Sequence, residues 1–339
     1  LSSAASDVYK RQDYLQSFAR KHRIVDLILE CRGVKKLLST YVEALPQLVN
    51  RTTGRIHTSF NQAMTATGRL SSTNPNLQNI PVRTEEGKEI RQAFLPRAGW
   101  VLLDADYSQI ELRLMAHFSG DHALVEAFRT GQDVHARTAS EIFDVPLDEV
   151  DSTLRSHAKA VNFGLIYGIS GFGLAKNTGV SRQEAQEFIN RYFAKYPGVK
   201  RFMDSAAEDG QHNGYALTLM GRRRYLPELK SDKAVVREFG KRAAMNTPVQ
   251  GTAADIIKLA MVRVDEALRR EGLKSRLILQ VHDELLLECP PEEVEKAGKL
   301  LKDAMEHVIE LRVPLLAEVH QGTCLLYTSP SPRDLSTSR

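Results

Sequence analysis

Cysteine is scarce in this 339-residue sequence, and its three cysteines are scattered. Cys31, Cys289 and Cys324 form no CxxC pair, which argues against a disulfide framework or a thiolate zinc site and fits a reducing cytosol. No uninterrupted apolar stretch is long enough to cross a membrane. The sequence also has no GxxxxGK[ST] motif, so any nucleoside triphosphate must be held without a Walker-type loop.

Neither sign of charge dominates the composition. Lys and Arg number 46 and Asp and Glu number 42, which leaves a formal net charge of +4. This mildly basic balance is compatible with a polyanionic partner. Hydrophobic residues make up 42% of the chain and charged residues 26%. These values are ordinary for a globular protein with one large domain or two subdomains.

The two ends of the chain lack the periodicity of the sequence between them. LSSAASDVYKRQ (1–12) and CLLYTSPSPRDLSTSR (324–339) resemble translated sequencing-adaptor read-through. We expect neither segment to belong to the fold, and we therefore expect a fragment of a longer protein.

Strand patterns occur in two groups, separated by a long block with helical periodicity. We expect strands at 55–62, 92–96, 100–108 and 313–319, two strands joined by a turn at Gly221 within 215–227, and a hairpin over 275–290. We expect helices at 13–33, 34–46, 109–120, 122–131, 133–143, 151–168, 181–197, 198–213, 290–309 and 233–270, the last of them broken near Pro248. Such an order favours an α+β fold with an antiparallel sheet and a helical insertion.

The segment 151–168 carries a row of side chains at helical spacing. Ser152 or Thr153 can cap its start and Gly168 can end it. The residues at every fourth position are Arg155, Lys159, Phe163 and Tyr167. The cationic end of such a row suits phosphates, and the aromatic end offers flat surfaces for a base and a sugar. The alternative is an amphipathic helix with a partly buried aromatic edge.

Two carboxylates stand at the ends of expected strands. Asp106 follows an apolar strand, and Asp283 lies at the tip of a hydrophobic hairpin. If these strands are neighbours, the two acids converge and suit Mg²⁺, which prefers oxygen ligands and keeps few from the protein. Separately, Asp106 could be a helix N-cap and Asp283 a turn residue. Together with a cationic helix, they indicate phosphoryl transfer.

Five segments resemble family A DNA polymerases, the bacterial DNA polymerase I type. DYSQIELR (106–113), RSHAKAVNFGLIYG (155–168) and QVHDE (280–284) resemble, in order, the three motifs of that family. Two further signatures are TATGRLSSTNPNLQNIPVR (65–83) and NTPVQGTAADIIK (246–258). The resemblance covers about residues 20–322.

The resemblance implies the palm and fingers of a right-hand polymerase, with the thumb largely missing. The implied divisions are 13–50 for helices at the thumb base, 51–112 for the first part of the palm, 113–234 for the fingers and 235–322 for the second part of the palm, with the foreign ends at 1–12 and 323–339. Without a thumb, duplex DNA loses many phosphate contacts, and we expect weak binding to primer–template.

The resemblance also assigns roles to individual residues. It implies that Asp106 and Asp283 bind two Mg²⁺ ions, with the Tyr107 carbonyl as a further ligand, and that Lys159 protonates the pyrophosphate. Residues implied to contact the incoming nucleotide are Arg155, Lys159, Phe163, Tyr167, Glu111, Gln109 and His135. Glu111 matches a steric gate against the ribose 2′-OH. Residues implied to contact DNA are Arg69, Arg242, Asn246, Gln250 and His282, while Glu284 lies in a motif without a clear role.

The implied partners are primer–template DNA and deoxynucleoside triphosphates, with no membrane. We expect a monomer in the cytoplasm of a bacterium or phage host, associated with the nucleoid and acting in replication or repair. The main alternative is a single-subunit, phage-type RNA polymerase, against which Glu111 argues. Another alternative is a catalytically weak DNA-binding fragment, against which the presence of both Asp106 and Asp283 argues.

Overall fold

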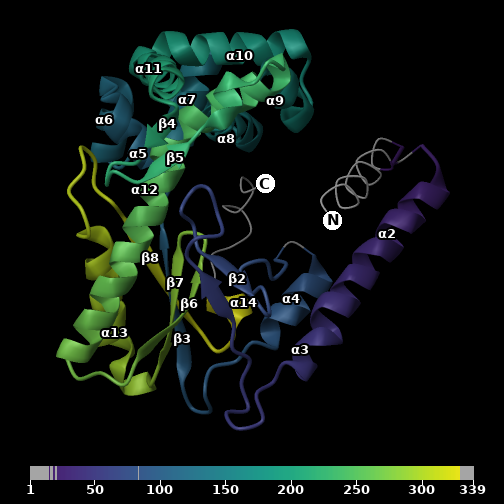
Figure 1. The fold of residues 1–339 in the computed structure, drawn as a ribbon, viewed down its shortest axis with the longest axis vertical. Helices are drawn as coiled ribbons and strands as arrows, with labels where there is room; N and C mark the ends of the chain where they lie inside the picture. Colours follow the sequence, from purple (N-terminus) through teal and green to yellow (C-terminus); the bar gives the residue numbers. More distant parts are fainter. Residues whose placement is uncertain (1–14, 16–17, 20, 83, 329–339) are drawn as a thin grey trace. The chain divides into compact units, whose positions relative to one another are not determined.

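The computed structural model describes residues 15, 18, 19, 21–82 and 84–328 (Figure 1). The chain divides into two compact units. The first comprises Leu1–Phe60 and Ser72–Ala93, and the second Asn61–Ser71 and Phe94–Arg339. This division does not test the predicted boundaries of palm and fingers, which stay predictions.

The first unit is mainly helical. Its elements are α2 (Arg23–Leu37), η1 (Leu38–Val42), α3 (Ala44–Gln47) and α4 (Glu85–Gln92), with most of the short paired strands β1 (Ser59–Asn61) and β2 (Ser71–Thr73). The buried Tyr41 donates its hydroxyl hydrogen to the Asn79 carbonyl at 2.6 Å, which ties the helical segment to the loop before α4. The strand expected at 92–96 is wrong, since α4 ends there and a loop follows.

The second unit is built on a four-stranded antiparallel sheet. Its strands are β3 (Val101–Tyr107), β6 (Arg276–Val281), β7 (Glu284–Cys289) and β8 (Ala317–Gly322), in the order β6-β7-β3-β8. All six residues of β7 are buried, with Leu285, Leu287 and Cys289 on one face and Glu284, Leu286 and Glu288 on the other. The predicted α+β class is confirmed. The last strand runs farther than predicted, to Gly322 rather than 319.

Nearly 170 residues separate β3 from β6, and most of them are helical. They form α5 (Ile110–Ser119), α6 (His122–Arg129), α7 (Val134–Phe143), η2 (Leu147–Glu149), α8 (Ser152–Ile166), α9 (Gly171–Thr178), α10 (Arg182–Lys195), α11 (Pro197–Asn213), β4 (Tyr215–Leu217), β5 (Arg223–Tyr225), η3 (Pro227–Lys230) and α12 (Ala234–Arg270). The predicted helical insertion is therefore confirmed, although α9 was not expected.

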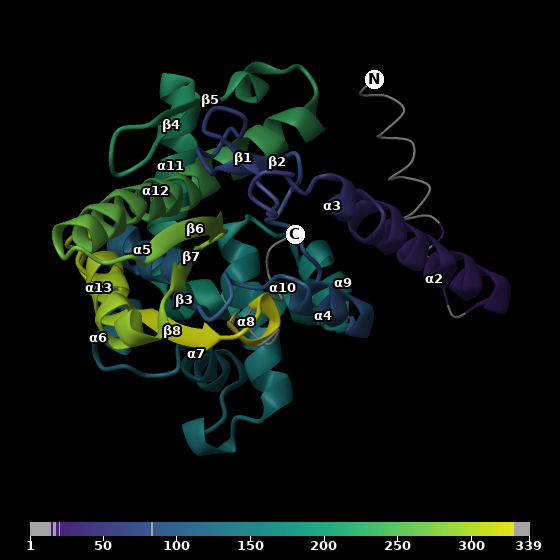
Figure 2. The ribbon, with the colours of Figure 1, turned by 90° about the horizontal axis from the view of Figure 1, so that it is seen from below.

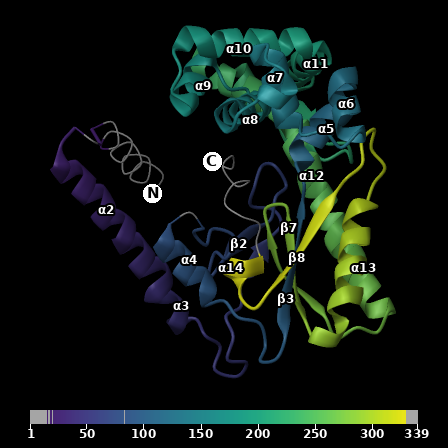
Figure 3. The same ribbon diagram turned by 180° about the vertical axis from the view of Figure 1, so that it is seen from behind.

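The long helix α12 links the helical block to the sheet. Figures 1 and 3 show α7 to α11 gathered at one end of α12, with the sheet and α13 (Val294–Glu306) at the other. The helices α12 and α13 pack on each other and against the sheet (Figure 2). One core of buried side chains, which includes Leu103, Met115, Leu165, Val264 and Leu287, runs through all of these layers.

The predicted break in α12 near Pro248 is wrong. The helix is continuous over 37 residues, although a proline inside a helix removes one hydrogen bond and crowds the preceding turn. Pro248 and its neighbours Thr247 and Val249 are buried, and α12 packs against α5, α11, α13 and β6. This burial along the length of the helix outweighs the local cost of the proline.

The tail residues that were expected to stand apart are partly in contact with the sheet. Cys324 and Leu325 are buried, and the Leu325 amide donates to the Phe94 carbonyl at 3.0 Å. The short helix α14 (Leu325–Thr328) follows β8 and contacts both β3 and β8. The 3₁₀ turn η4 (Pro291–Glu293) lies earlier in the chain, just before α13. Residues 1–12 and 329–339 lie outside the described residues.

The cap of α8 differs from the prediction. Asp151 is the N-cap, and its Oδ1 accepts a hydrogen bond from the Leu154 amide at 2.7 Å. Ser152 and Thr153 already lie in the first helical turn, so neither is the cap. Gly168 has a φ of +65° just after the helix, as predicted for a terminating glycine.

We expect Asp151→Ala to lower the free energy of unfolding by about 0.5–2 kcal/mol, because an amide at the helix start loses its acceptor. The matched control is Thr153→Ala, an exposed neighbour that caps nothing. Urea denaturation followed by circular dichroism gives both values. Equal effects of the two substitutions would contradict the cap assignment.

Candidate active site

A cavity of about 310 Å³ lies in the second unit, where β3, the β6–β7 turn, α5, α7 and α8 meet. Its walls include every residue that the sequence assigned to metal or nucleotide, and also Arg69, His282 and Glu284. The remaining predicted DNA contacts, Arg242, Asn246 and Gln250, are not in its walls. Residues predicted from four separate motifs thus share one cavity.

One wall is the carboxylate edge of the sheet. Because β3 and β7 pair antiparallel, Asp106 lies opposite Glu284, next to the hairpin turn that carries Asp283. The Tyr107 amide donates to the Asp283 carbonyl at 3.3 Å. The Tyr107 hydroxyl donates to the Met305 carbonyl at 2.7 Å, inside the core. Of Tyr107, only a main-chain atom can therefore act as a ligand in the cavity.

This edge suits a hard divalent cation. Asp106 and Asp283 offer carboxylate oxygens, the donors that Mg²⁺ prefers. Within the described ranges, no group of three or more His, Cys, Asp or Glu is arranged to hold a metal. Two carboxylates and one carbonyl form a sparse ligand set, which would leave most coordination positions to water and phosphate oxygens.

The two turns at this edge have unusual backbone geometry. Gln109, between β3 and α5, has a φ of +54°, and His282, between β6 and β7, has a φ of +52°. Left-handed conformations are uncommon for residues other than glycine, and they concentrate at functional sites. The His282 pKa is lowered, chiefly because the side chain is largely buried, although Asp283 acts in the opposite direction.

The opposite wall is the predicted row on α8. Lys159 is 7% exposed, whereas Arg155 is half-exposed near the start of the helix. The Arg155 Nε donates to Asp133 Oδ2 at 2.7 Å. Farther along, the rings of Phe163 and His135 lie 5.6 Å apart between centroids. The row therefore presents cations first and aromatic rings after them, as its spacing predicted.

The Glu111 carboxyl group is buried near both a cation, Arg69, and another acid, Asp283. It is 5% exposed, accepts from Arg69 Nη2 at 2.9 Å, and accepts from the Tyr167 hydroxyl at 2.8 Å. Burial raises the pKa of Glu111 to about 7, and the charge of Asp283 adds to this, while Arg69 and Tyr167 oppose it. Burial and the Glu111 carboxylate also raise the pKa of Tyr167.

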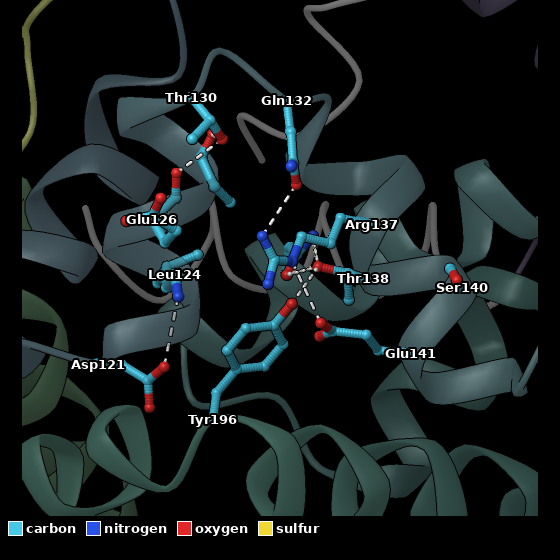
Figure 4. A network of polar contacts seen from close by, with 12 residues as sticks. Asp121, Leu124, Glu126, Thr130, Gln132, Arg137, Thr138, Ser140, Glu141 and Tyr196 are labelled. Carbon is cyan, nitrogen blue, oxygen red and sulfur yellow. Dashed lines mark hydrogen bonds and ion pairs between the residues drawn. The ribbon is translucent and has the colours of Figure 1, made fainter. Parts of the chain in front are cut away.

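A buried polar network holds α7 against α8 behind the cavity. Asn162 Nδ2 lies 3.1 Å from His135 Nδ1 and 3.2 Å from Thr138 Oγ1. Thr138 Oγ1 is 3.4 Å from the Tyr196 hydroxyl. Figure 4 shows these two side chains pointing toward each other. Asn162, Thr138 and Tyr196 are almost completely buried. Because such groups need partners in the core, the network fixes how α7 and α8 pack.

The α12 residues predicted to contact DNA form a row of their own. Arg242, Asn246 and Gln250 recur every fourth residue and share one face of the helix. Asn246 Nδ2 donates to the Ile166 carbonyl at 3.3 Å, near the end of α8. A Cβ on Gly168 would lie 2.7 Å from Arg242 Cγ, so the α8 terminus approaches α12 closely. The row therefore borders the aromatic end of α8.

Comparisons with known proteins show the family of this chain. The profile of DNA polymerase family A matches residues 3–325. The chain belongs to DNA polymerase family A. It is 54% identical over 311 residues to DNA polymerase I of Geobacillus stearothermophilus, covering 91% of this chain and 36% of that protein. It is 50% identical over 308 residues to the thermostable DNA polymerase I of Thermus aquaticus, covering 91% and 37%.

A solved structure from the same family is also similar. It is the POL domain of Pol1 from M. smegmatis in complex with DNA primer-template and dNTP, at 47% identity and a TM-score of 0.87. The match covers 93% of this chain and 56% of that one. The chain thus spans about a third of the length of the curated family A relatives it matches.

Sequence reasoning missed several residues in and around this candidate site. Glu318 and His320 line the cavity from β8, and Glu318 lies opposite Asp106 in the strand register. The alternation of 317–322 was the available signal, but the strand was expected to end at 319. Asp133, which bonds Arg155, and Asn162, which contacts His135, were also missed because their importance depends on packing between helices.

We expect the stability of the family A fold to fall as pH rises from about 4.5 to about 7, in part because of Glu111. Its pKa is higher in the folded state than the ordinary 4.5, so folding favours the protonated form and ionisation removes that advantage. Ionisation of Glu111 should lower the free energy of unfolding by roughly 2–4 kcal/mol over this pH range. Glu111→Gln should therefore make the free energy of unfolding less dependent on pH. Urea denaturation of both proteins at pH 5 and pH 8 measures the difference. Parallel pH profiles would refute this explanation.

Proposed function

We propose that this chain catalyses template-directed addition of deoxynucleotides to a primer 3′ end, with release of pyrophosphate. The observation that carries the proposal is the arrangement of the cavity. The carboxylates of Asp106 and Asp283 line the same cavity as the cationic and aromatic row of α8. A reaction that moves a phosphoryl group depends mainly on positioning and charge neutralisation, and this cavity offers both.

The α8 row orients the incoming nucleotide. Arg155 and Lys159 bind the triphosphate, and the low exposure of Lys159 strengthens its attraction to phosphate because less water screens it. Phe163 packs against the base and sugar, and Tyr167 provides the stacking surface where the new base pair forms. His135, held by Asn162, adds a contact to the phosphates or sugar.

Asp106 and Asp283, with the Tyr107 carbonyl, would hold two Mg²⁺ ions. When bound, such ions lower the pKa of the primer hydroxyl and neutralise the charge of the leaving pyrophosphate. The two carboxylates position the primer end and the triphosphate relative to each other. The primer 3′-hydroxyl loses its proton to water and its oxygen bonds to the α-phosphorus, while the bond from the α-phosphorus to the pyrophosphate oxygen breaks. Lys159 donates a proton to that leaving oxygen.

Glu111 selects the sugar. Its two carboxylate oxygens accept from Arg69 and Tyr167, so the side chain cannot rotate away without breaking both bonds. A side chain fixed in this way occupies the volume that a ribose 2′-OH would need. Ribonucleotides are therefore excluded by a steric clash rather than by a missing attraction. Gln109, in the turn before Glu111, lines the same side of the cavity.

The primer–template lies next to the cavity in this proposal. Arg69 and His282 contact it from the cavity wall, and Arg242, Asn246 and Gln250 contact it from the α12 row. The palm then comprises 51–112 and 235–322, with the fingers at 113–234. Glu284 pairs opposite Asp106 and supports the strand that carries it.

In the described part of the chain, no helix is long and apolar enough to span a membrane. We propose a monomer in the bacterial cytoplasm, at the nucleoid.

Primer extension tests the proposal. With Mg²⁺, dNTPs and enzyme in excess over micromolar primer–template, we expect extension that follows the template. Asp283→Asn should reduce the rate by at least about a thousandfold, because a ligand charge is lost where phosphate charge must be neutralised. The control is Asp204→Asn on α11, an exposed acid outside the cavity. Equal activity of the Asp283 variant and the wild type would refute the proposed site.

A second experiment tests the sugar selection. Glu111→Ala should lower the preference for dNTP over rNTP by at least about tenfold, since the side chain that clashes with the 2′-OH is gone. Glu111→Gln keeps the volume and should keep the preference. Single-nucleotide incorporation with dCTP and CTP measures both ratios. A wild-type protein that prefers CTP would instead support an RNA polymerase.

A further inference from the structure

Asp133 links the two helices that carry the phosphate-binding side chains. It is the N-cap of α7, and its Oδ1 accepts from the amides of His135 and Ala136 at 2.9 and 3.1 Å. Its other oxygen, Oδ2, accepts from Arg155 Nε on α8 at 2.7 Å. One carboxylate therefore caps α7 and anchors the guanidinium of Arg155.

Asp133 bonds one edge of the Arg155 guanidinium, and the other edge is left for a ligand. Asp133 engages the Nε side, and a guanidinium carries four more N–H donors on its two Nη atoms. Arg155 lines the cavity, whereas Asp133 does not. The acid therefore holds the arginine without forming part of the cavity wall. This arrangement is expected of a residue that orients a phosphate-binding side chain. A residue that contacts the phosphate itself would be expected in the cavity wall.

We propose that Asp133 is a positioning residue that orients Arg155 toward the triphosphate. The inference rests on the proposed function, because it requires that Arg155 contacts the triphosphate. Both side chains are a little over 40% exposed, so an unanchored Arg155 would sample many rotamers in solvent. The anchor removes this freedom before the nucleotide binds, which improves affinity by preorganisation. Burial raises the pKa of Asp133, but its bonds to Arg155 and the helix amides lower it overall, so the anchor stays ionised at neutral pH.

The rest of the α7–α8 packing does not depend on the charge of Asp133. Asn162 contacts both His135 and Thr138 farther along the two helices, where all three side chains are buried. Asparagine is also as good an N-cap as aspartate. Asp133→Asn therefore keeps the cap and the buried contacts and weakens only the bond to Arg155.

The first experiment measures single-nucleotide incorporation by the full chain with Asp133→Asn. We expect the KM for dNTP to rise on the order of three- to fivefold, as for the loss of a half-exposed ion pair, with kcat within about twofold. The melting temperature should stay at the wild-type value. The matched control is Asp204→Asn, which breaks the Asp204–Lys200 pair of the same 2.7 Å length and similar exposure on α11. This control should leave the KM unchanged.

A double-mutant cycle shows whether Asp133 acts through Arg155. Arg155→Ala should raise the KM more than Asp133→Asn does, and adding Asp133→Asn to Arg155→Ala should change nothing further. A KM effect of Asp133→Asn that persists in the Arg155→Ala background would overturn the inference. A fall in KM on Asp133→Asn would also overturn it, because the acid would then compete with the phosphate for Arg155.

The positioning role of Asp133 and the proposed function can be wrong independently of each other. If Arg155→Ala raises the KM but Asp133→Asn does not, the positioning role is wrong and the proposed function stands. If Arg155→Ala extends primers with an unchanged KM, Arg155 is not a triphosphate contact, and both the positioning role and that part of the proposed function are wrong.

Discussion

The pairing of β3 with β7 and β8 is the constraint on which the rest of the second unit depends. It places Asp106 between Glu284 and Glu318 and next to the turn that carries Asp283. Since these strands are far apart in the sequence, the helical block between them must leave the sheet and return to it. The start of α5 follows directly from the end of β3, so Glu111 reaches the cavity because Asp106 does.

The cavity balances charge within a small space. Acids approach from the sheet and cations from α8, while Glu111 is buried between Asp283 and Arg69. An acid in such a place ionises reluctantly, and its two hydrogen bonds fix it in one conformation. Keeping this carboxyl group buried therefore costs some stability once it ionises.

Local patterns predicted the parts of the structure that depend on local geometry. The α8 row and the hairpin that carries Asp283 could be predicted from the spacing of a few residues. The family motifs predicted that Asp106 and Glu111 lie in one site, and both side chains line the same cavity. The errors arose where packing competes with propensity. Burial along α12 overrides the proline at 248, and the bond of Asp133 to Arg155 depends on a helix from another segment. No pattern within α7 or α8 alone could have indicated that bond.

The separation of β3 from its partner strands has a consequence for how the chain folds. During synthesis, β3 emerges long before β7 and β8 exist, and its apolar side chains have no sheet to join. Contacts so distant in sequence form slowly, and unpaired apolar strands are prone to aggregate. The helical block can form first and shorten the distance that β7 must search. The cavity at the edge of the sheet is therefore expected to form last, only when the final strand is in place.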